Sequence, residues 1–225
     1  MTTASSKAAT PRTRSLNGMF ADRADAGRRL AALLEPYRAE DPVVVGLPRG
    51  GVVVAAEVAD ALDAPLDIIL VRKLGLPANP EVAMGAIGEG GVRVLDDIAE
   101  RVPVEAVAAV EQRELAELER RTRLYRPEGH RVSLEHRTVV VVDDGIATGA
   151  TALAACRVAR AEGAARVVLA VPVAPHGWER RFGAAADQYV AVTAPRDLWA
   201  IGRFYDDFRP TTDDEVLGLL RAHRG

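Results

Sequence analysis

The sequence predicts an α/β protein built on an open, mainly parallel sheet with helices on its faces. Four consecutive valines, Val139–Val142, are β-branched and apolar, which is typical of a strand buried on both faces. A loop and an Ala-rich helix, Ala152–Glu162, follow this strand. The segment Pro42–Leu47 has the same character and leads into an apolar helix, Val52–Leu62. Strands that alternate with helices in this way favour parallel pairing through right-handed crossovers.

Further strands and helices extend this alternation. We expect core strands at Leu66–Val71, Arg166–Val173 and Tyr189–Thr193, a hairpin of Met84–Ile87 and Val92–Leu95, and helices at Ala24–Tyr37, Val104–Tyr125 and Val216–His223. Residues 1–18 are polar and lack periodicity, so a mobile tail is expected there. Residues 19–225 are expected to form a single domain, because their number suits one hydrophobic core.

Composition and charge exclude several classes of protein. The net charge of −3 argues against a nucleic-acid binder that relies on bulk positive charge. No apolar run approaches the length that crosses a membrane, and the N-terminal segment has no apolar signal region. A cytoplasmic protein is therefore expected. The single cysteine, Cys156, excludes an internal disulfide and is expected to be a packed thiol rather than a nucleophile.

Two acids stand where the valine strand ends. Asp143 and Asp144 could accept hydrogen bonds from sugar hydroxyls or help to hold a metal ion. The loop after them enters a helix N-terminus, where free backbone N–H groups and the helix dipole can bind a phosphate. The seven residues of this loop are Gly145, Ile146, Ala147, Thr148, Gly149, Ala150 and Thr151. Acids and loop together predict a site for a phosphorylated sugar.

A second loop of this kind follows the first core strand. Gly50 and Gly51 allow backbone conformations that are closed to other residues, and they let an anion approach the N–H groups. Arg49 adds a fork of donors for a phosphate. Arg72 and Lys73 are expected at the carboxyl end of the next strand, on the same rim as Arg49. By itself, the first segment could equally be a plain turn, and an isolated basic pair is more often solvated than bound to a ligand.

The thirteen residues Val139–Thr151 resemble the phosphoribosyl diphosphate (PRPP) motif of the type I phosphoribosyltransferases. This resemblance implies that Asp143 and Asp144 contact the ribose hydroxyls and that residues 145–151 hold the 5′-phosphate. Residues 48–51 resemble the pyrophosphate loop of these enzymes, which often contains a cis peptide bond. The segment after Val71 is similar to the pyrophosphate-contacting segment of adenine-type members, although Pro77 comes one residue early. The chain also resembles a bacterial subgroup of the family that is sometimes fused to hydrolase domains.

The resemblance implies an enzyme of the pentosyltransferase class. Ribose 5-phosphate would pass from PRPP to a nitrogen acceptor, a nucleobase, in nucleotide salvage, and pyrophosphate would leave. Arg49, Gly50, Gly51, Arg72 and Lys73 would contact pyrophosphate together with Mg²⁺. Asp143 and Asp144 would meet the metal only indirectly or through the substrate, since Mg²⁺ retains waters and binds substrate oxygens. A hood or flap around residues 78–95 would close over the site, and a homodimer is expected.

Three points leave alternatives open. Trp199, Phe204 and Tyr205 could stack on the acceptor base, or they could seal one end of the core. Ala147 occupies the position where hypoxanthine-type enzymes have an aspartate, and the sequence identifies no other residue as the group that activates the base. A non-catalytic regulator that senses PRPP on the same fold is therefore the alternative function.

One further set of charged residues is expected to form a solvated, ion-paired face or a dimer surface: Glu114, Glu117, Glu119, Arg120, Arg121 and Arg123.

Overall fold

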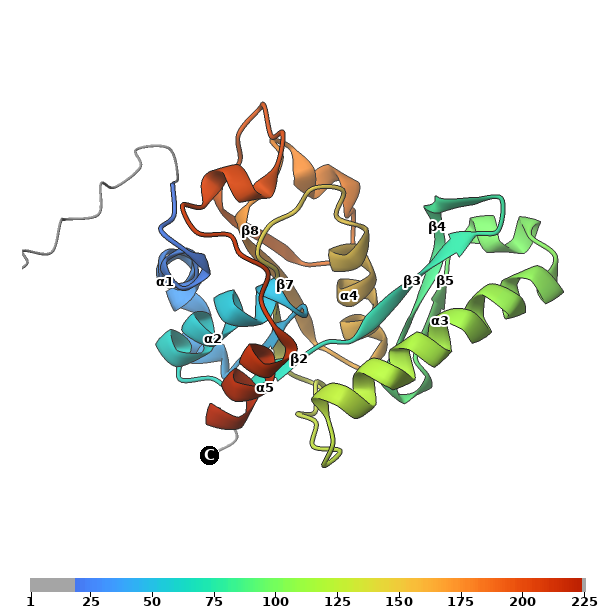
Figure 1. Ribbon diagram of the computed structural model, residues 1–225, viewed down its shortest axis with the longest axis horizontal. Helices are drawn as coiled ribbons and strands as arrows, with labels where there is room; N and C mark the ends of the chain where they lie inside the picture. Colours follow the sequence, from blue (N-terminus) through green and yellow to red (C-terminus); the bar gives the residue numbers. More distant parts are fainter. Residues whose placement is uncertain (1–18, 224–225) are drawn as a thin grey trace, which may run out of the picture.

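The structure is a computed structural model that describes residues 19–223, except for the side chain of residue 81. The tail predicted for residues 1–18 lies outside the described residues. Five strands form the main sheet, and every pairing in it is parallel. Their order is β2 (Leu66–Ile68), β1 (Val43–Gly46), β6 (Thr138–Val142), β7 (Arg166–Val173) and β8 (Gln188–Thr193). The predicted open, parallel α/β fold is confirmed (Figure 1).

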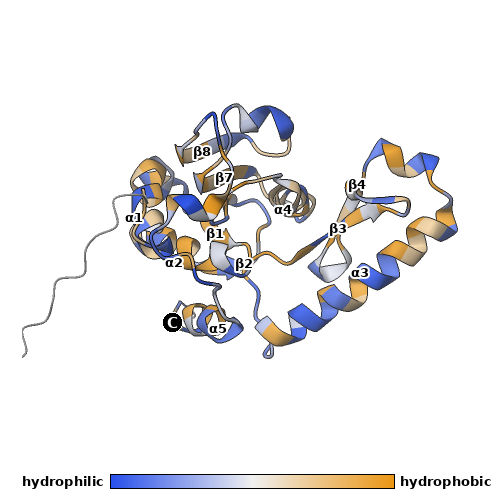
Figure 2. Ribbon diagram, turned by 45° about the horizontal axis from the view of Figure 1, so that its top comes forward, coloured by the Kyte–Doolittle hydropathy of each residue, from blue (hydrophilic) through white to orange (hydrophobic). Residues whose placement is uncertain are grey.

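Helices cover both faces of this sheet, as the run of valines in β6 predicts. Val140 and Val142 pack in one hydrophobic cluster with α1 (Arg23–Leu34) and α2 (Gly50–Leu62). Val139 and Val141 belong to a second cluster, which includes the buried side of α4 (Ala150–Ala161). Successive side chains of a strand point to opposite faces, so a strand between two helical layers is apolar at every position. Figure 2 shows the hydrophobic residues gathered along these central elements.

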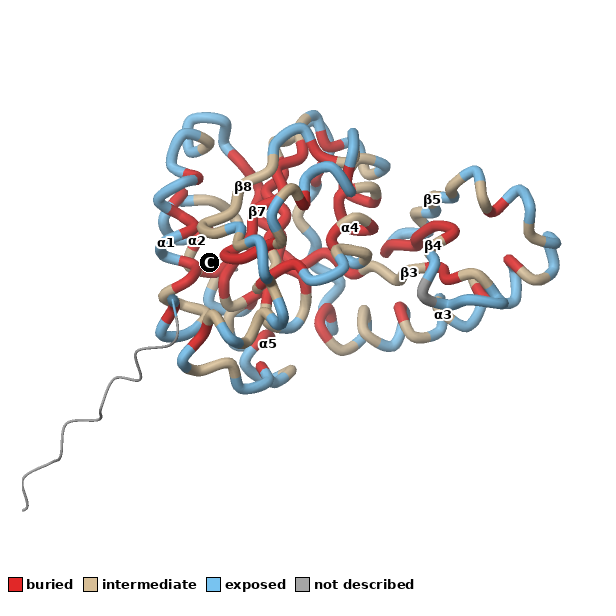
Figure 3. The backbone as a smooth tube through the Cα atoms, turned by 90° about the horizontal axis from the view of Figure 1, so that it is seen from above, coloured by how far each residue is buried: buried red, intermediate tan, exposed pale blue. Residues whose placement is uncertain are grey.

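A smaller lobe projects from the main sheet and is called the hood below (Figures 1 and 3). It consists of β3 (Val71–Leu76), β4 (Asn79–Gly88) and β5 (Arg93–Leu95), which pair antiparallel, and of the long helix α3 (Val104–Tyr125). The predicted hairpin is confirmed as β4 and β5. The single strand predicted at Leu66–Val71 is wrong, because the chain leaves the main sheet after Ile68 and starts the hood at Val71.

The remaining elements are short or terminal. The α-helix α5 (Asp213–Ala222) lies near the C-terminus. Five 3₁₀ helices complete the described chain: η1 (Glu35–Glu40), η2 (Glu89–Gly91), η3 (Asp97–Arg101), η4 (Trp178–Arg181) and η5 (Ile201–Phe204). The predicted helix 24–37 ends as an α-helix at Leu34, since Pro36 cannot continue the hydrogen-bond pattern. Among the described residues, no helix is both long and apolar enough to cross a membrane.

A buried arginine ties the hood to the main sheet. Arg126 follows α3, and its guanidinium bonds both Glu89 at the tip of the hood hairpin (2.8 Å) and Asp67 in β2 (2.7 Å). It also donates to the backbone oxygens of Ile68 and His130. All three charged side chains are at most 7% exposed. Because removal of one member would leave uncompensated buried charge, this cluster fixes the position of the hood.

Candidate active site

The acidic pair lies at the middle of the carboxyl edge of the main sheet. Asp143 and Asp144 directly follow β6, which pairs with β1 on one side and β7 on the other. Asp143 accepts a hydrogen bond from the backbone N–H of Asp144 through Oδ1 (2.9 Å). Both residues are half-buried. This edge is where ligands bind in open α/β sheets, so the position agrees with a binding role for the acids.

Arg23 balances the charge of Asp144. Its Nε lies 2.7 Å from Oδ2 of Asp144, and the two side chains are 11% and 17% exposed. The guanidinium also donates to the backbone oxygen of Arg209 (2.8 Å) and lies 3.9 Å from the centre of the Phe208 ring. The sequence analysis missed Arg23, because this residue at the start of α1 is 121 positions from its partner. No local motif reveals such a pairing.

Asp143 has a different electrostatic environment. Burial raises the pKa of its carboxyl group well above the ordinary value, and the neighbouring charge of Asp144 raises it further. The hydrogen bond from the Asp144 N–H and the charge of Arg23 act in the opposite direction. One acid of the pair is therefore tied to an arginine, whereas the other holds its proton more strongly than a free aspartate does.

The glycines of the second loop pack directly on these acids. A Cβ atom on Gly50 would lie 2.0 Å from Oδ2 of Asp144, and one on Gly51 would lie 2.9 Å from Cα of Asp143. Neither glycine has a positive φ angle, so the expectation of a special backbone conformation is wrong. Glycine is required here for close approach instead. The peptide bond between Pro48 and Arg49 is cis, as in the loop that this segment resembles.

Two helices present uncapped N-termini at this edge. Helix α2 begins after Arg49 and helix α4 after Gly149, and neither cap residue supplies a side-chain hydrogen bond. By contrast, Asp22 caps α1 and Thr212 caps α5. The first N–H groups of a helix need a partner, so the ends of α2 and α4 can accept an anion.

The 145–151 loop connects the acids to the second of these helix ends. Gly149 has a φ angle of 81°, in the left-handed region that favours glycine. Thr148 lies exposed in the loop, and Thr151 lies exposed in the first turn of α4. The backbone N–H of Ile146 is already bonded to Val173. The accessible donors of the loop are therefore near its C-terminal half.

The residues predicted to contact pyrophosphate come from two parts of the structure. Arg49 lies beside the acids and forms a long ion pair with Asp213 of α5 (4.0 Å). Arg72 lies near the start of hood strand β3, and it pairs with Glu114 of α3 (2.6 Å). Lys73 also belongs to β3, so the prediction that Arg72 and Lys73 end a core strand is wrong. The chain enters the hood earlier than its apolar pattern indicates.

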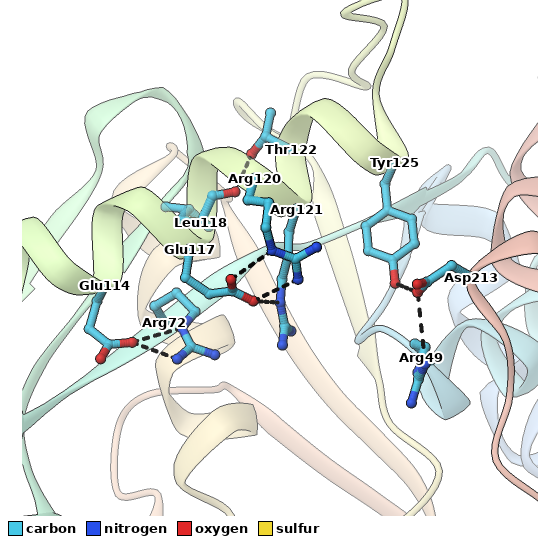
Figure 4. A network of polar contacts seen from close by, with 10 residues as sticks. All are labelled: Arg49, Arg72, Glu114, Glu117, Leu118, Arg120, Arg121, Thr122, Tyr125 and Asp213. Atoms are coloured by element: carbon cyan, nitrogen blue, oxygen red, sulfur yellow. Dashed lines mark hydrogen bonds and ion pairs between the residues drawn. The ribbon is translucent and has the colours of Figure 1, made fainter.

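Figure 4 shows these arginines beneath α3, with carboxylates beside them. The hydroxyl of Tyr125 donates to Asp213, and burial followed by this contact raises the pKa of Tyr125 to about 12. Hydrogen bonds from Arg120 and Arg121 lower the pKa of Glu117 to about 2. The solvated face predicted for α3 is confirmed only in part. Glu119, Arg120 and Arg123 are exposed, whereas Glu114, Glu117 and Arg121 are half-buried.

The aromatic candidates for base binding separate into two groups. Tyr205 is buried, stacks on Phe208 (4.8 Å between ring centres), and donates from its hydroxyl to the backbone oxygen of Asp144 (2.7 Å). It therefore supports the acidic pair and offers no free ring face. Trp199 is 84% exposed and lines a cavity of about 470 Å³ with Phe204 and Asp197. These two aromatic residues remain candidates for contact with the acceptor.

The comparison with known proteins agrees with this geometry. Residues 20–193 match the model of the phosphoribosyl transferase domain. The chain belongs to this family. The acidic pair and the 145–151 loop, which were predicted to form the site, lie at the carboxyl edge of the main sheet.

Particular relatives support the assignment. Proteins of two Mycobacterium tuberculosis strains, CDC 1551 and H37Rv, carry the name "putative phosphoribosyl transferase", and each is 53% identical over 210 residues. These matches cover 92% of this chain and 47% of each relative, so the chain spans about half of their length. The crystal structure of TT1426 from Thermus thermophilus is 46% identical, with a TM-score of 0.86. That match covers 92% of this chain and 99% of the other.

Proposed function

We propose that this phosphoribosyl transferase domain transfers ribose 5-phosphate from PRPP to a nitrogen atom of a nucleobase and releases pyrophosphate. One observation supports this most strongly: Gly50 and Gly51 pack against Asp143 and Asp144. In PRPP the pyrophosphate is attached to C1 of the ribose, and the 2′-hydroxyl is attached to the adjacent carbon. A pyrophosphate loop in contact with a hydroxyl-binding acid pair has the spacing that this substrate needs.

The rest of PRPP fits the surrounding elements. The 5′-phosphate would bind the free N–H groups of the 145–151 loop and the N-terminus of α4. The pyrophosphate would bind the N-terminus of α2 and Arg49, which would leave its long contact with Asp213. Arg72 and Lys73 lie in the hood, so they would reach the leaving group only from the hood side. This arrangement holds both ends of the sugar and leaves C1 between them.

The acids would act on the sugar and on the charge that develops there. As the bond from C1 to pyrophosphate breaks, the ribose acquires oxocarbenium character. Asp144 and Asp143 would accept hydrogen bonds from the hydroxyls and stabilise this positive charge. The acceptor nitrogen would then bond to C1 as pyrophosphate departs.

Mg²⁺ fits this site as a companion of the substrate. Among the described residues, no group of three His, Cys, Asp or Glu side chains could hold a metal ion. Asp144 is already paired with Arg23, so one carboxylate of the pair is partly neutralised. Mg²⁺ would therefore bind chiefly through pyrophosphate oxygens and water, and it would supply charge stabilisation to the leaving group.

The sensor alternative has one observation in its favour. Ala147, where a base-activating aspartate occurs in hypoxanthine-type enzymes, is exposed, and it offers no proton acceptor. A protein that binds PRPP without turnover needs no such group. A cytoplasmic homodimer that acts in nucleotide salvage remains a prediction.

Pyrophosphate release from PRPP and Mg²⁺ tests the proposal against a panel of purine and pyrimidine bases. A thermal melt of each mixture would run in parallel. We expect release with one class of base and none from an Asp144→Asn variant that keeps its fold. A higher melting temperature with PRPP but no release with any base would favour the sensor. If PRPP causes neither a higher melting temperature nor pyrophosphate release, PRPP binding itself is contradicted.

A further inference from the structure

A second cavity lies away from the acidic pair, between the core and the hood. Its volume is about 690 Å³, which is within the range of small-molecule sites. Helix α4 forms one wall, and residues 180–185 of η4 and the following turn form another. Val94 of hood strand β5 completes the lining. The cavity therefore touches both lobes of the molecule.

Four arginines line this cavity: Arg157, Arg160, Arg180 and Arg181. The two from α4 are already balanced, because Arg157 pairs with Asp96 (2.6 Å) and Arg160 pairs with Asp187 (2.5 Å). The two from η4 are exposed, and their side chains have no hydrogen-bond or ion-pair partner within residues 19–223. The lining therefore carries about two uncompensated positive charges. This charge suits one dianionic phosphate, which arginine forks bind in a bidentate manner.

The same cavity has an apolar part. Phe182 is buried at its wall, and Val94 and Ala161 contribute aliphatic surface. A simple inorganic anion would leave this surface without a partner. A ligand with a phosphate at one end and a flat, weakly polar group at the other would use both parts of the lining. A nucleoside monophosphate has this chemistry.

Phe182 also contacts the predicted phosphate loop. A Cβ atom on Gly149 would lie 2.7 Å from Cζ of Phe182, so this ring packs on the residue that precedes α4. The ring is held in turn by Trp178, at 5.5 Å between ring centres. A ligand that moves or immobilises Phe182 would therefore act on the 145–151 loop through direct packing.

We propose that this cavity binds a nucleoside monophosphate or a similar organic phosphate, and that the bound ligand alters PRPP affinity through Phe182 and Gly149. Arg180 and Arg181 hold the phosphate, and Phe182 contacts the flat group. Binding at the cavity is independent of the proposed function. The effect on PRPP affinity rests on that function, so the two parts are measured separately.

The first measurement is calorimetric titration of the protein with AMP. We compare the wild type, an Arg180→Gln/Arg181→Gln variant and a control, Arg38→Gln/Arg101→Gln, which alters two exposed arginines whose side chains have no partner in the described chain. We expect one binding component to weaken by about tenfold or more in the cavity variant only. All three proteins should melt at the same temperature. Identical isotherms for the three proteins would overturn the proposed site, whether or not AMP also binds at the acidic pair.

The second measurement is PRPP affinity with Mg²⁺, with and without saturating AMP. We expect AMP to change the affinity by about fivefold or more in the wild type and the control, and by less in the cavity variant. An equal change in all three proteins would mean competition at the acidic pair, and it would refute coupling through Phe182. If PRPP does not bind at all, the proposed function fails, and the coupling fails with it. In that case the AMP titration still shows whether AMP binds in the cavity.

Discussion

Replacement of Arg23 by glutamine tests what holds the acidic pair in place. The substitution keeps most of the length of the side chain but removes its charge. It removes the ion pair with Asp144, the hydrogen bond to Arg209 and the stacking on Phe208. Asp144 then becomes a largely buried carboxylate without a counter-ion, next to a second acid.

The size of the effect follows from burial. Removal of one member of a fully buried ion pair costs about 3–5 kcal/mol of stability. The two side chains here are 11% and 17% exposed, so solvent screens part of this effect. We expect the Arg23→Gln variant to lose about 2–4 kcal/mol in the free energy of unfolding. Arg28 is the matched control, because it lies on the same helix, is 57% exposed and pairs with Glu57 at 3.4 Å. Its change to glutamine should cost about 0.5 kcal/mol or less.

Urea denaturation of a double-mutant cycle measures this pairing directly. The cycle consists of Arg23→Gln, Asp144→Asn and the combined variant, each followed by fluorescence and circular dichroism. We expect the combined variant to be more stable than the sum of the single effects predicts, by about 1–2 kcal/mol, because it has no unpaired charge. Strictly additive effects, or an Arg23→Gln effect no larger than that of Arg28→Gln, would refute the assignment of Arg23 as the partner that holds Asp144.

Three further predictions concern the same framework. Gly50→Ala would place a methyl group 2.0 Å from the Asp144 carboxylate, so it should lose about 1–3 kcal/mol in urea denaturation, whereas Gly218→Ala, with open space around it, should not destabilise. The raised pKa of Asp143 means that the folded protein binds the proton more tightly. Wild-type stability should therefore fall as pH rises above the ordinary carboxyl range, and Asp143→Asn should remove this contribution; parallel pH profiles of the two proteins would contradict it. Arg126→Met should cost about 3–5 kcal/mol, because its two buried carboxylate partners lose their counter-ion, and a cost below about 1 kcal/mol would show that the cluster does not hold the hood.

Local sequence patterns predicted the strands of the main sheet because the burial of a strand on both faces is visible in a few consecutive residues. The run Val139–Val142 is apolar at every position, and only a strand covered on both faces makes use of that. The acids that follow it, and the loop from Gly145, then lie at the carboxyl edge by chain continuity alone. The hood hairpin was predictable for the same reason, since two short apolar runs flank Gly90 and Gly91.

The errors arose where strands change partner. Val71 continues the apolar pattern of the preceding strand, but the backbone leaves the main sheet before it. Arg72 and Lys73 therefore belong to hood strand β3 rather than to a strand of the main sheet. A change of sheet depends on which strands are available for pairing, and an apolar run has the same appearance in either sheet.

The sequence by itself determined the order of chemical groups along the chain: an apolar strand, two acids, and a small-residue loop at a helix N-terminus. Only the tertiary structure decided the partners of these groups. Arg23 reaches Asp144 across 121 positions, and Tyr205 supports the same residue from 61 positions away. Gly50 is glycine because Asp144 occupies the space that a side chain would need. Such contacts depend on how separate elements pack in space, and the period of a strand or a helix carries no information about the residues that it will meet.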